Sequence, residues 1–314
     1  VTKVFPEESK IILDDSREIY YEKLLISTGS RAFIPPVSGN YEEGVFSLRS
    51  LDDLKDIRSY INDVDRVTVI GGGLLGIEAA WSLKSLGKKV SIVEFAPYLL
   101  PKQLDRELGE KLADKLREYD IEVHLPHSVE GISGEDDGVT GIRLENGDVL
   151  KANAILISTG IVPNIDLVKD TTIGTNRGII VDKYLKTNVD NIYAAGDVAE
   201  YNGLVLGLWT TGNEQGKIAA TNILGGNAEY NHPKPFSSLR IGDIKLFSTG
   251  NILDYDDVYE YKNESQNTTK KLFVKDNNLI GAILFGDIKH MNLFKNAVFS
   301  NVSIDAFLKD NEMF

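Results

Sequence analysis

The chain of 314 residues contains no cysteine. These residues therefore supply no disulfide, no thiolate nucleophile, no redox-active dithiol and no thiolate ligand for an iron–sulfur cluster. Histidine is also scarce: there are four, scattered along the chain without the neighbouring carboxylates that would complete a metal site. We therefore predict neither thiol chemistry nor a metal site within these residues.

Long apolar runs and an excess of positive charge are lacking as well. No stretch approaches the roughly 18 apolar residues of a membrane-spanning helix, and no secretory signal is visible, so we expect a cytoplasmic protein without membrane contact. Lys and Arg number 34 against 47 Asp and Glu, which gives a net charge of −13. Such an acidic surface argues against nucleic acid or an anionic membrane as a partner.

The chain does contain alternating strand and helix patterns, and its length indicates two or three domains. Short apolar runs at residues 23–27 and 154–158 are typical of buried parallel strands, and each is followed by Thr-Gly. Residues 104–117 predict an amphipathic helix, because leucine recurs there at every fourth position.

Turn and capping signals divide the rest of the chain. Residues 10–21 predict two strands around a polar turn, and residues 141–150 predict a hairpin with an Asn-Gly turn. Ser50 is expected to cap a helix. Residues 212–224 favour a further helix, and the tail favours strands with one late helix at residues 291–299.

The clearest motif is Gly-x-Gly-x-x-Gly at Gly71, Gly73 and Gly76. It follows a strand predicted at residues 66–70, opens a predicted helix and precedes a second strand at residues 89–94. In a dinucleotide-binding β-α-β unit the first glycine makes the tight turn, the second lets the pyrophosphate approach, and the third lets helix and strand pack closely. The helix N-terminus then faces the phosphates.

Glu94 ends the second strand of this unit, roughly 20 residues after the first glycine, where an acidic residue accepts hydrogen bonds from the adenosine ribose. A carboxylate at this place repels a 2′-phosphate, and residues 95–100 offer no Arg or Lys to receive one. The sequence therefore predicts NADH in preference to NADPH.

Four motifs resemble those of the two-dinucleotide flavoprotein reductases, the pyridine nucleotide-disulfide oxidoreductase superfamily, and they occur in that family's order. Residues 24–31 and 154–160 resemble its Ala-Thr-Gly strand ends. Residues 191–197 resemble its second FAD motif, and residues 76–78 resemble its Gly-x-Glu. The resemblance implies an enzyme that uses FAD and NAD(H).

The resemblance also implies roles for individual residues. Glu78 is expected near the nicotinamide carboxamide, and Asp197 at the ribityl chain of FAD. Because the cofactors carry the chemistry, no side chain is expected to act as nucleophile or acid. The expected NAD(H) contacts are Gly71, Gly73, Leu74, Leu75, Gly76, Glu78, Glu94, Thr159 and Gly160. The expected FAD contacts are Thr28, Gly29, Ser30, Gly196, Asp197 and Gln215.

Within the superfamily the chain most resembles the branch of NADH:rubredoxin reductases and the NADH-dehydrogenase part of nitrite reductases. Trp209 with residues 213–222, and residues 239–250, carry this resemblance. Gln215 and Lys217 are expected to start a helix whose N-terminal amides face the flavin pyrimidine.

His232-Pro233 has no glutamate nearby, so we interpret it as a linker and not as the His-Glu acid–base pair of the disulfide reductases. The family also begins with its own Gly-x-Gly-x-x-Gly for the ADP part of FAD, whereas this sequence holds only the second such motif and does not begin with Met. We therefore expect that an N-terminal FAD segment is missing. In related oxidases and coenzyme A disulfide reductases that segment holds the redox cysteine.

We thus predict an α/β fold with two Rossmann-like dinucleotide-binding domains, the FAD one incomplete, and a small C-terminal α+β domain. The FAD-binding domain takes residues 1–37 and 163–228, the NAD-binding domain residues 38–162, and the C-terminal domain residues 229–314.

The predicted function is that of an FAD-dependent NADH oxidoreductase, which passes hydride from NADH to FAD and then electrons to rubredoxin, another small redox protein or a reductase partner. One alternative is a thiol-dependent NADH oxidase or disulfide reductase with its cysteine in the missing segment. Another is a flavin-free NAD-binding module of a larger complex. The sequence leaves open the acceptor and whether the protein is a monomer or a dimer.

Overall fold

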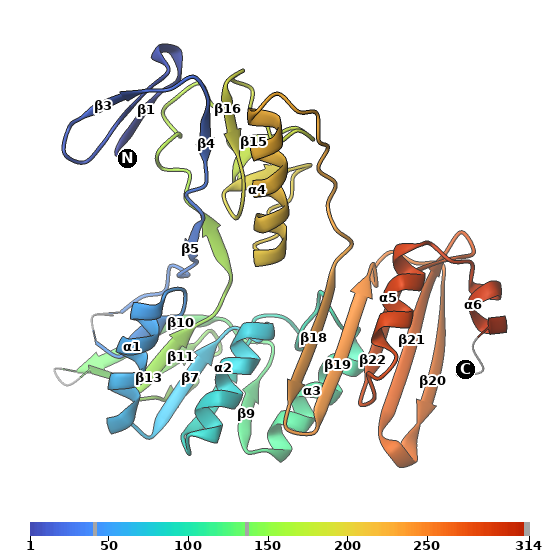
Figure 1. The fold of residues 1–314 in the computed structure, drawn as a ribbon. Coiled ribbons are helices and arrows are strands. Elements are labelled where there is room, and N and C mark those ends of the chain that lie inside the picture. The colour runs from blue at the N-terminus through green and yellow to red at the C-terminus, as the bar shows by residue number, and fades with distance from the viewer. Residues whose placement is uncertain (40–42, 136–137, 311–314) are drawn as a thin grey trace. The chain divides into compact units, whose positions relative to one another are not determined.

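The computed structural model describes residues 1–39, 43–135 and 138–310. The chain forms two compact units, each built from two segments that are distant in the sequence (Figure 1). Unit 1 consists of Val1–Phe33 and Gly160–Pro233, and unit 2 of Ile34–Thr159 and Lys234–Phe314. The mixed α/β fold predicted from the sequence is confirmed.

Unit 1 is built largely from short strands. Its first sheet is antiparallel and contains β1 (Lys3–Phe5), β2 (Lys10–Ile12) and β3 (Glu18–Tyr20), which confirms the strands predicted within residues 10–21. The other strands form three pairs: β4 (Leu24–Ile26) with β16 (Ile192–Ala194), β5 (Ser30–Ala32) with β14 (Ile161–Pro163), and β15 (Ile179–Val181) with β17 (Ala199–Tyr201). The β4–β16 pair is parallel, as predicted for residues 23–27.

The core of unit 1 gathers these short strands around one helix. α4 (Trp209–Ile223) buries Ala219 in the same hydrophobic cluster as Ile26 of β4 and Ile192 of β16. A single-turn 3-10 helix, η1 (Pro6–Glu8), joins β1 to β2.

Unit 2 contains a five-stranded parallel sheet in the order β6-β13-β7-β8-β9 (Figure 1). Its strands are β6 (Val45–Ser47), β7 (Arg66–Ile70), β8 (Lys89–Val93), β9 (Ile121–His124) and β13 (Ala154–Ile157). The connecting helices are α1 (Leu51–Tyr60), continued by η2 (Ile61–Asp63), α2 (Leu74–Ser85) and α3 (Arg106–Glu118). All four residues of β13 are buried, as predicted for the apolar run at residues 154–158.

An antiparallel meander lies between β9 and β13 in the sequence. It consists of β10 (Val129–Glu135), β11 (Gly138–Leu144) and β12 (Val149–Lys151). Gly147 takes a φ of +88° in the turn that joins β11 to β12, a conformation that favours glycine. The hairpin predicted from the Asn-Gly pair is therefore confirmed.

Local capping explains where two helices of unit 2 begin. Ser50 Oγ accepts a hydrogen bond from the Asp53 backbone N–H at 3.1 Å, and the Asp53 carboxylate accepts one from the Ser50 N–H at 2.7 Å, so α1 starts with a capping box. Asp105 caps α3 in a similar way through the Leu108 N–H. The side chains of the predicted leucine repeat are fully buried, namely Leu104, Leu108, Leu112 and Leu116.

The C-terminal part of unit 2 is an antiparallel sheet in the order β18-β19-β22-β21-β20. Its strands are β18 (Phe236–Ile241), β19 (Ile244–Gly250), β20 (Asp257–Asn263), β21 (Thr268–Lys275) and β22 (Asn278–Phe285), with η3 (Glu264–Gln266) between β20 and β21. Two helices follow it, α5 (Met291–Phe299) and α6 (Ile304–Asp310). The expectation of one late helix was therefore wrong in number, because α6 is too short to show a helical repeat.

The largest of the hydrophobic clusters in unit 2 connects its two sheets. It contains Leu108 and Leu112 of α3 together with Leu246 and Phe285 of the antiparallel sheet. Side chains of the parallel sheet, its helices and the antiparallel sheet therefore pack together in this cluster. Among the residues that the structure describes, no helix has the length and apolar character needed to cross a membrane.

Candidate functional site

The glycine-rich motif lies at the carboxyl end of β7, where that strand turns into α2. The Gly71 N–H donates to the Val93 carbonyl of β8 at 2.8 Å, and Gly71 takes a φ of +113°. Gly73 is the N-cap of α2 and has no side chain to accept the first amides of the helix. These amides are therefore available to an anion at the carboxyl edge of the sheet.

The other two glycines differ in the space around them. A Cβ on Gly76 would lie 2.0 Å from the Gly71 carbonyl oxygen, so only glycine lets α2 approach the turn so closely. A Cβ on Gly73 would have no heavy atom of the described residues within 4 Å. This open space at Gly73 leaves room for the close approach of a ligand, which is what the role expected of that residue requires.

Glu94 follows β8 and is held by two backbone amides. One carboxylate oxygen accepts from the Gly72 N–H at 2.6 Å, and the other accepts from the Ala96 N–H at 2.7 Å. Each oxygen has a second lone pair, so the carboxylate retains capacity to accept from a ribose hydroxyl. The residue pattern does not predict these backbone bonds, because nothing in it distinguishes a carboxylate that accepts from amides from one that does not.

The remaining NAD(H) candidates lie along α2 and beyond β13. Leu75 is 73% exposed, Glu78 is exposed on the same helix, and Leu74 is half-buried. Thr159 ends the first segment of unit 2, and Gly160 begins the second segment of unit 1. The structure thus gathers the motif glycines, Glu78 and Glu94 in one β-α-β unit, whereas Thr159 and Gly160 fall at the boundary between the units.

The FAD candidates of unit 1 are joined by side-chain hydrogen bonds. Ser30 Oγ donates to the Asp197 carboxylate at 2.9 Å, although the two residues are far apart in the sequence. Thr28 Oγ1 donates to the Asn164 carbonyl at 2.8 Å, and Asn164 Nδ2 donates back to the Thr28 carbonyl at 2.9 Å. The Asn164 N–H also donates to the Gly29 carbonyl at 2.9 Å.

These contacts show Asn164 as a residue that closes the loop after β4. Asn164 is not among the site residues predicted from the sequence, although Pro163-Asn164 follows the second Thr-Gly pair. The two hydrogen bonds between Asn164 and Thr28 join two segments that are distant in the sequence.

Gln215 and Lys217 do not start a helix, so this expectation was wrong. α4 begins at Trp209, which places the two residues in its second and third turns. The first turn contains β-branched threonines and Gly212, which are weak helix formers, and their presence obscured the true start. The side chain of Gln215 is instead buried, and its Oε1 accepts from the Gly196 N–H at 2.8 Å.

A cluster of ion pairs joins α3 to the antiparallel sheet of unit 2. Nζ of Lys271, whose side chain is 7% exposed, lies 2.6 Å from the Asp105 carboxylate, 2.7 Å from that of Glu107 and 2.8 Å from that of Glu260. Burial lowers the pKa of Lys271, but the hydrogen bonds that its ammonium donates to the three carboxylates outweigh burial and raise the pKa above its ordinary value. Hydrogen bonds from Lys262 and Lys271 lower the pKa of Glu107 to about 2.

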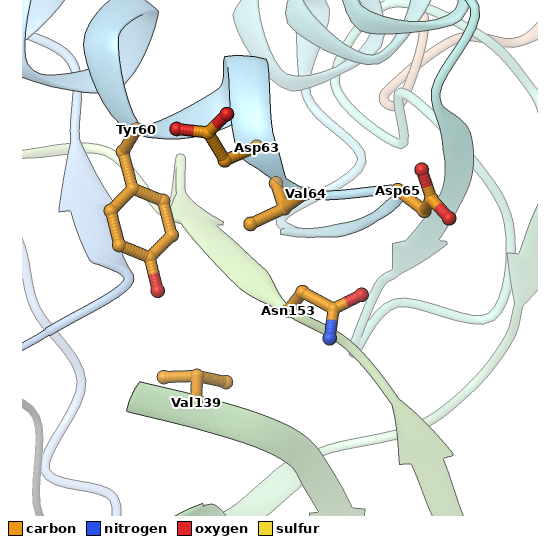
Figure 2. Close-up of a pocket in the computed structure, with 6 residues that line it drawn as sticks. All are labelled: Tyr60, Asp63, Val64, Asp65, Val139 and Asn153. Atoms are coloured by element: carbon orange, nitrogen blue, oxygen red, sulfur yellow. The ribbon is translucent and has the colours of Figure 1, made fainter. Parts of the chain in front are cut away.

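A polar pocket of about 400 Å³ lies at the end of the parallel sheet opposite to the glycine-rich motif. Figure 2 shows six residues that line it. Asp65 directly precedes β7, and Asn153 directly precedes β13, so the pocket lies at the amino ends of these strands. Ligands of open parallel sheets bind at the carboxyl ends. We therefore do not assign this pocket to a cofactor. The described residues contain no group of three or more His, Asp or Glu side chains placed to hold a metal ion.

Comparison with protein families gives two matches along the chain. Residues 1–216 match the model of the family described as pyridine nucleotide-disulphide oxidoreductase. Residues 235–302 match the model described as the rubredoxin NAD+ reductase C-terminal domain. The first match covers more than half of the chain and includes every candidate site residue.

Curated relatives extend the similarity over nearly the whole chain. This chain is 34% identical to the nitrite reductase [NAD(P)H] of Bacillus subtilis (strain 168) over 295 residues, which cover 93% of this chain and 36% of that protein. It is 31% identical to the NADH-rubredoxin oxidoreductase of Clostridium acetobutylicum over 304 residues, which cover 97% of this chain and 76% of that protein. The chain thus spans little more than a third of the length of the nitrite reductase.

A solved structure gives a similar result for the fold. The crystal structure of NADH:rubredoxin oxidoreductase from Clostridium acetobutylicum superposes with a TM-score of 0.81 at 32% sequence identity, covering 99% of this chain and 79% of that one. The resemblance to the flavoprotein reductases stated from the motifs is therefore confirmed, including its rubredoxin reductase and nitrite reductase branch.

Proposed function

We propose that this chain, which belongs to the pyridine nucleotide-disulphide oxidoreductase family, is an NADH-dependent flavoprotein that transfers electrons to a small redox protein. Members of the family bind FAD and NAD(H), and the relatives are NAD(P)H-dependent flavoprotein oxidoreductases. The observation that carries the proposal is the pairing of an open, helix-capping Gly73 with an amide-anchored Glu94 in one β-α-β unit.

The NADH half of the proposal rests on unit 2. The N-terminal amides of α2 would hold the pyrophosphate, and Glu94 would hold the adenosine ribose. Its negative charge disfavours a 2′-phosphate, which supports NADH over NADPH. Glu78 is exposed on α2, and we propose it as a contact of the nicotinamide end.

The FAD half rests on unit 1. The Asp197 carboxylate accepts a hydrogen bond from Ser30 Oγ, and the Gly196 N–H donates one to Gln215 Oε1. Thr28 and Gly29 complete the proposed contacts in a loop locked to Asn164. When bound, a flavin can accept two electrons from a hydride donor and pass them singly to a one-electron acceptor. The protein residues contribute orientation and electrostatics.

The small redox protein is the finer part of the proposal. It is supported by the match of residues 235–302 to the rubredoxin NAD+ reductase C-terminal domain and by the 31% identity to a relative named as an NADH-rubredoxin oxidoreductase. The alternative, a thiol-dependent oxidase or disulfide reductase, requires a cysteine outside these 314 residues, which contain none. The assignment of residues 1–37 and 163–228 to FAD, 38–162 to NAD and 229–314 to a C-terminal domain is proposed on the same grounds.

The test is an anaerobic absorbance titration of the purified protein with NADH, followed by oxidised rubredoxin. Bleaching of a yellow flavin band by NADH, and its return when rubredoxin is added, are the expected results. NADPH at equal concentration is the control and is expected to bleach the band far more slowly. A protein that binds NADH but has no flavin band would overturn the proposal in favour of an NAD-binding module.

A further inference from the structure

We propose that this chain associates with a second copy of itself through β20, the edge strand of the antiparallel sheet in unit 2. The two β20 strands pair antiparallel across a twofold axis at Tyr261 and join the two sheets into one. This inference goes beyond the proposed function and does not depend on it. It concerns the oligomeric state, which the sequence leaves open.

β20 presents an open edge to a further strand. Among the residues that the structure describes, β20 is the last strand in the order β18-β19-β22-β21-β20 and pairs with β21 alone (Figure 1). Six of its seven residues are exposed. They include large apolar side chains, with Val258 45% and Tyr259 39% exposed. The backbone N–H and C=O groups on the outer side of such a strand are a template for pairing with another chain.

β20 lacks the features that keep many edge strands unpaired. It contains no proline, and its register with β21 runs from Asp257 to Asn263 without a shift. Its one lysine, Lys262, does not carry a lone charge, because its Nζ lies 2.7 Å from the Glu107 carboxylate and 3.1 Å from that of Glu260. A proline, a bulge or an unpaired lysine would each oppose the addition of a strand.

The charges on β20 favour one register for a symmetric pair. Opposed residues of paired strands lie on the same face, so a twofold axis perpendicular to the sheet passes beside a single residue of each strand. With the axis at Glu260, the two Glu260 carboxylates face each other, which is unfavourable. With the axis at Tyr259, Glu260 faces Val258 and no charge is paired. With the axis at Tyr261, each Glu260 faces Lys262 of the second copy, and two ion pairs form.

The new ion pairs extend a cluster that already exists in each copy. Glu260 lies opposite Lys271 of β21, and its carboxylate is 2.8 Å from Lys271 Nζ. Lys262 reaches Glu107 on the same face of the sheet. The contact overlaps five residues of each strand, which is small against the roughly 1,200 Å² that stable interfaces bury, so we expect a weak dimer with a dissociation constant on the order of 10 μM.

The first test is sedimentation equilibrium of the purified protein from about 1 to 300 μM, a range that brackets this dissociation constant. Wild type is expected to pass from monomer to dimer. Lys262→Glu places a glutamate opposite each Glu260 and is expected to raise the dissociation constant at least about tenfold. Lys245→Glu is the matched control, because it makes the same change on an exposed lysine of β19, which β22 and β21 separate from β20.

The control should dimerise like wild type. Wild-type protein that stays monomeric throughout the range would overturn the proposal and would point to a different partner for β20. A dimer that Lys262→Glu and Lys245→Glu weaken equally, or not at all, would also overturn it, because the two copies would then meet at another surface.

A mixture of two variants tests the register. Glu260→Lys places lysines opposite lysines, just as Lys262→Glu places glutamates opposite glutamates, so neither variant should dimerise alone. Mixed in equal amounts, they oppose a glutamate to a lysine at both positions, and a heterodimer should form with about the affinity of wild type. Two folded variants that remain monomeric in the mixture would contradict the register.

Cysteine cross-linking keeps the register testable if Glu260→Lys does not fold beside Lys271. The chain contains no cysteine, so a single introduced one can pair only with its copy. Tyr261→Cys brings the two cysteines opposite each other with Cα atoms about 4.5 to 5.5 Å apart, within the range of a disulfide. Tyr259→Cys, the control, leaves them more than about 13 Å apart.

Both cysteine variants are treated with oxidised glutathione and separated on a non-reducing gel. Tyr261→Cys is expected to give disulfide-linked dimers, and Tyr259→Cys is expected to remain monomeric. Equal cross-linking of the two variants, or cross-linking of Tyr259→Cys alone, would refute a twofold axis at Tyr261.

Discussion

The two candidate cofactor sites are assembled in different ways. In unit 2 the proposed NADH site comes mainly from one stretch, residues 71–94, which forms the turn, helix and strand end of a single β-α-β unit. In unit 1 the proposed FAD site combines residues 28–30, 196–197 and 215, which lie on separate segments. One site is contiguous in the sequence and the other exists only after folding.

This difference determines what holds each site together. The unit 2 site is backbone geometry: a glycine turn, the amides of α2, and Glu94 anchored by the Gly72 and Ala96 amides. The unit 1 site is held by side chains, with Ser30 on Asp197 and Gln215 on Gly196. We therefore expect substitutions at the unit 2 site to change the room and the charge available to the cofactor. Substitutions at the unit 1 site should instead weaken the hydrogen bonds that hold the cofactor contacts in place.

The largest effect is expected from Gly76→Ala. Its new Cβ would lie 2.0 Å from the Gly71 carbonyl oxygen, so α2 has to move away from the turn. We expect a loss of about 3 kcal/mol or more in the free energy of unfolding, measured by urea titration, together with loss of NADH binding. Gly73→Ala is the matched variant, because its Cβ meets open space. It should unfold like wild type yet bind NADH at least about tenfold more weakly. Equal stability of the two variants would contradict the different roles of these glycines.

Lys271→Ala tests whether unit 2 also depends on side-chain networks away from its cofactor site. The substitution leaves the carboxylates of Asp105, Glu107 and Glu260 without their buried partner. We expect the free energy of unfolding to fall by about 3 kcal/mol, measured by urea denaturation at neutral pH. Lys275→Ala is the control, because Lys275 pairs with Asp254 at the surface and should cost little. A similar, small loss for both variants would show that the cluster does not support the packing of α3.

Acid should weaken the same cluster. Hydrogen bonds from Lys262 and Lys271 lower the pKa of Glu107 from its ordinary value of 4.5 to about 2 in the folded protein. The folded-state pKa is below the unfolded one, so the contribution of Glu107 to stability is present above pH 4.5 and is lost as the pH falls toward 2. The urea midpoint of wild type should therefore decline through this window more steeply than that of Glu107→Gln. Parallel curves would show that Glu107 does not contribute.

Glu94→Arg tests the charge at the NADH site. We expect NADH to bind at least about tenfold more weakly and NADPH to gain, because the substitution removes the ribose acceptor and introduces a partner for a 2′-phosphate. FAD binding should not change. Glu122→Arg on the neighbouring strand β9 makes the same change of charge on a side chain that is 69% exposed, and it is the control. Equal shifts in both variants would assign the effect to general charge and not to Glu94.

Ser30→Ala should have the smallest effect. It tests whether side-chain hydrogen bonds hold the proposed FAD site of unit 1. It removes the donor to the Asp197 carboxylate without changing any backbone bond. We expect FAD affinity to fall about fivefold while NADH affinity stays unchanged, both measured by fluorescence titration. A loss of NADH affinity of the same size would show that the two sites are not independently assembled.

The sequence predicted best where structure is local. The strands and helix around Gly71, the hairpin at Asn146-Gly147 and the cap at Ser50 are all found where the residue pattern placed them. It predicted least well where neighbours override local preference. α4 begins at Trp209 in spite of a weakly helix-forming first turn, because the helix is packed in the core of unit 1. α6 escaped notice because its burial of Ile304 and Phe307 depends on contacts made in the folded chain.

The sequence by itself determined the NAD-type motif and the family, since a glycine spacing, a following carboxylate and ordered strand ends are properties of short contiguous segments. Only the tertiary structure decided that Ser30 Oγ donates to the Asp197 carboxylate and that Gln215 Oε1 accepts from the Gly196 N–H. The physical reason is that a hydrogen bond between distant segments depends on the direction of two side chains, and those directions are set by burial and packing that no local residue pattern encodes.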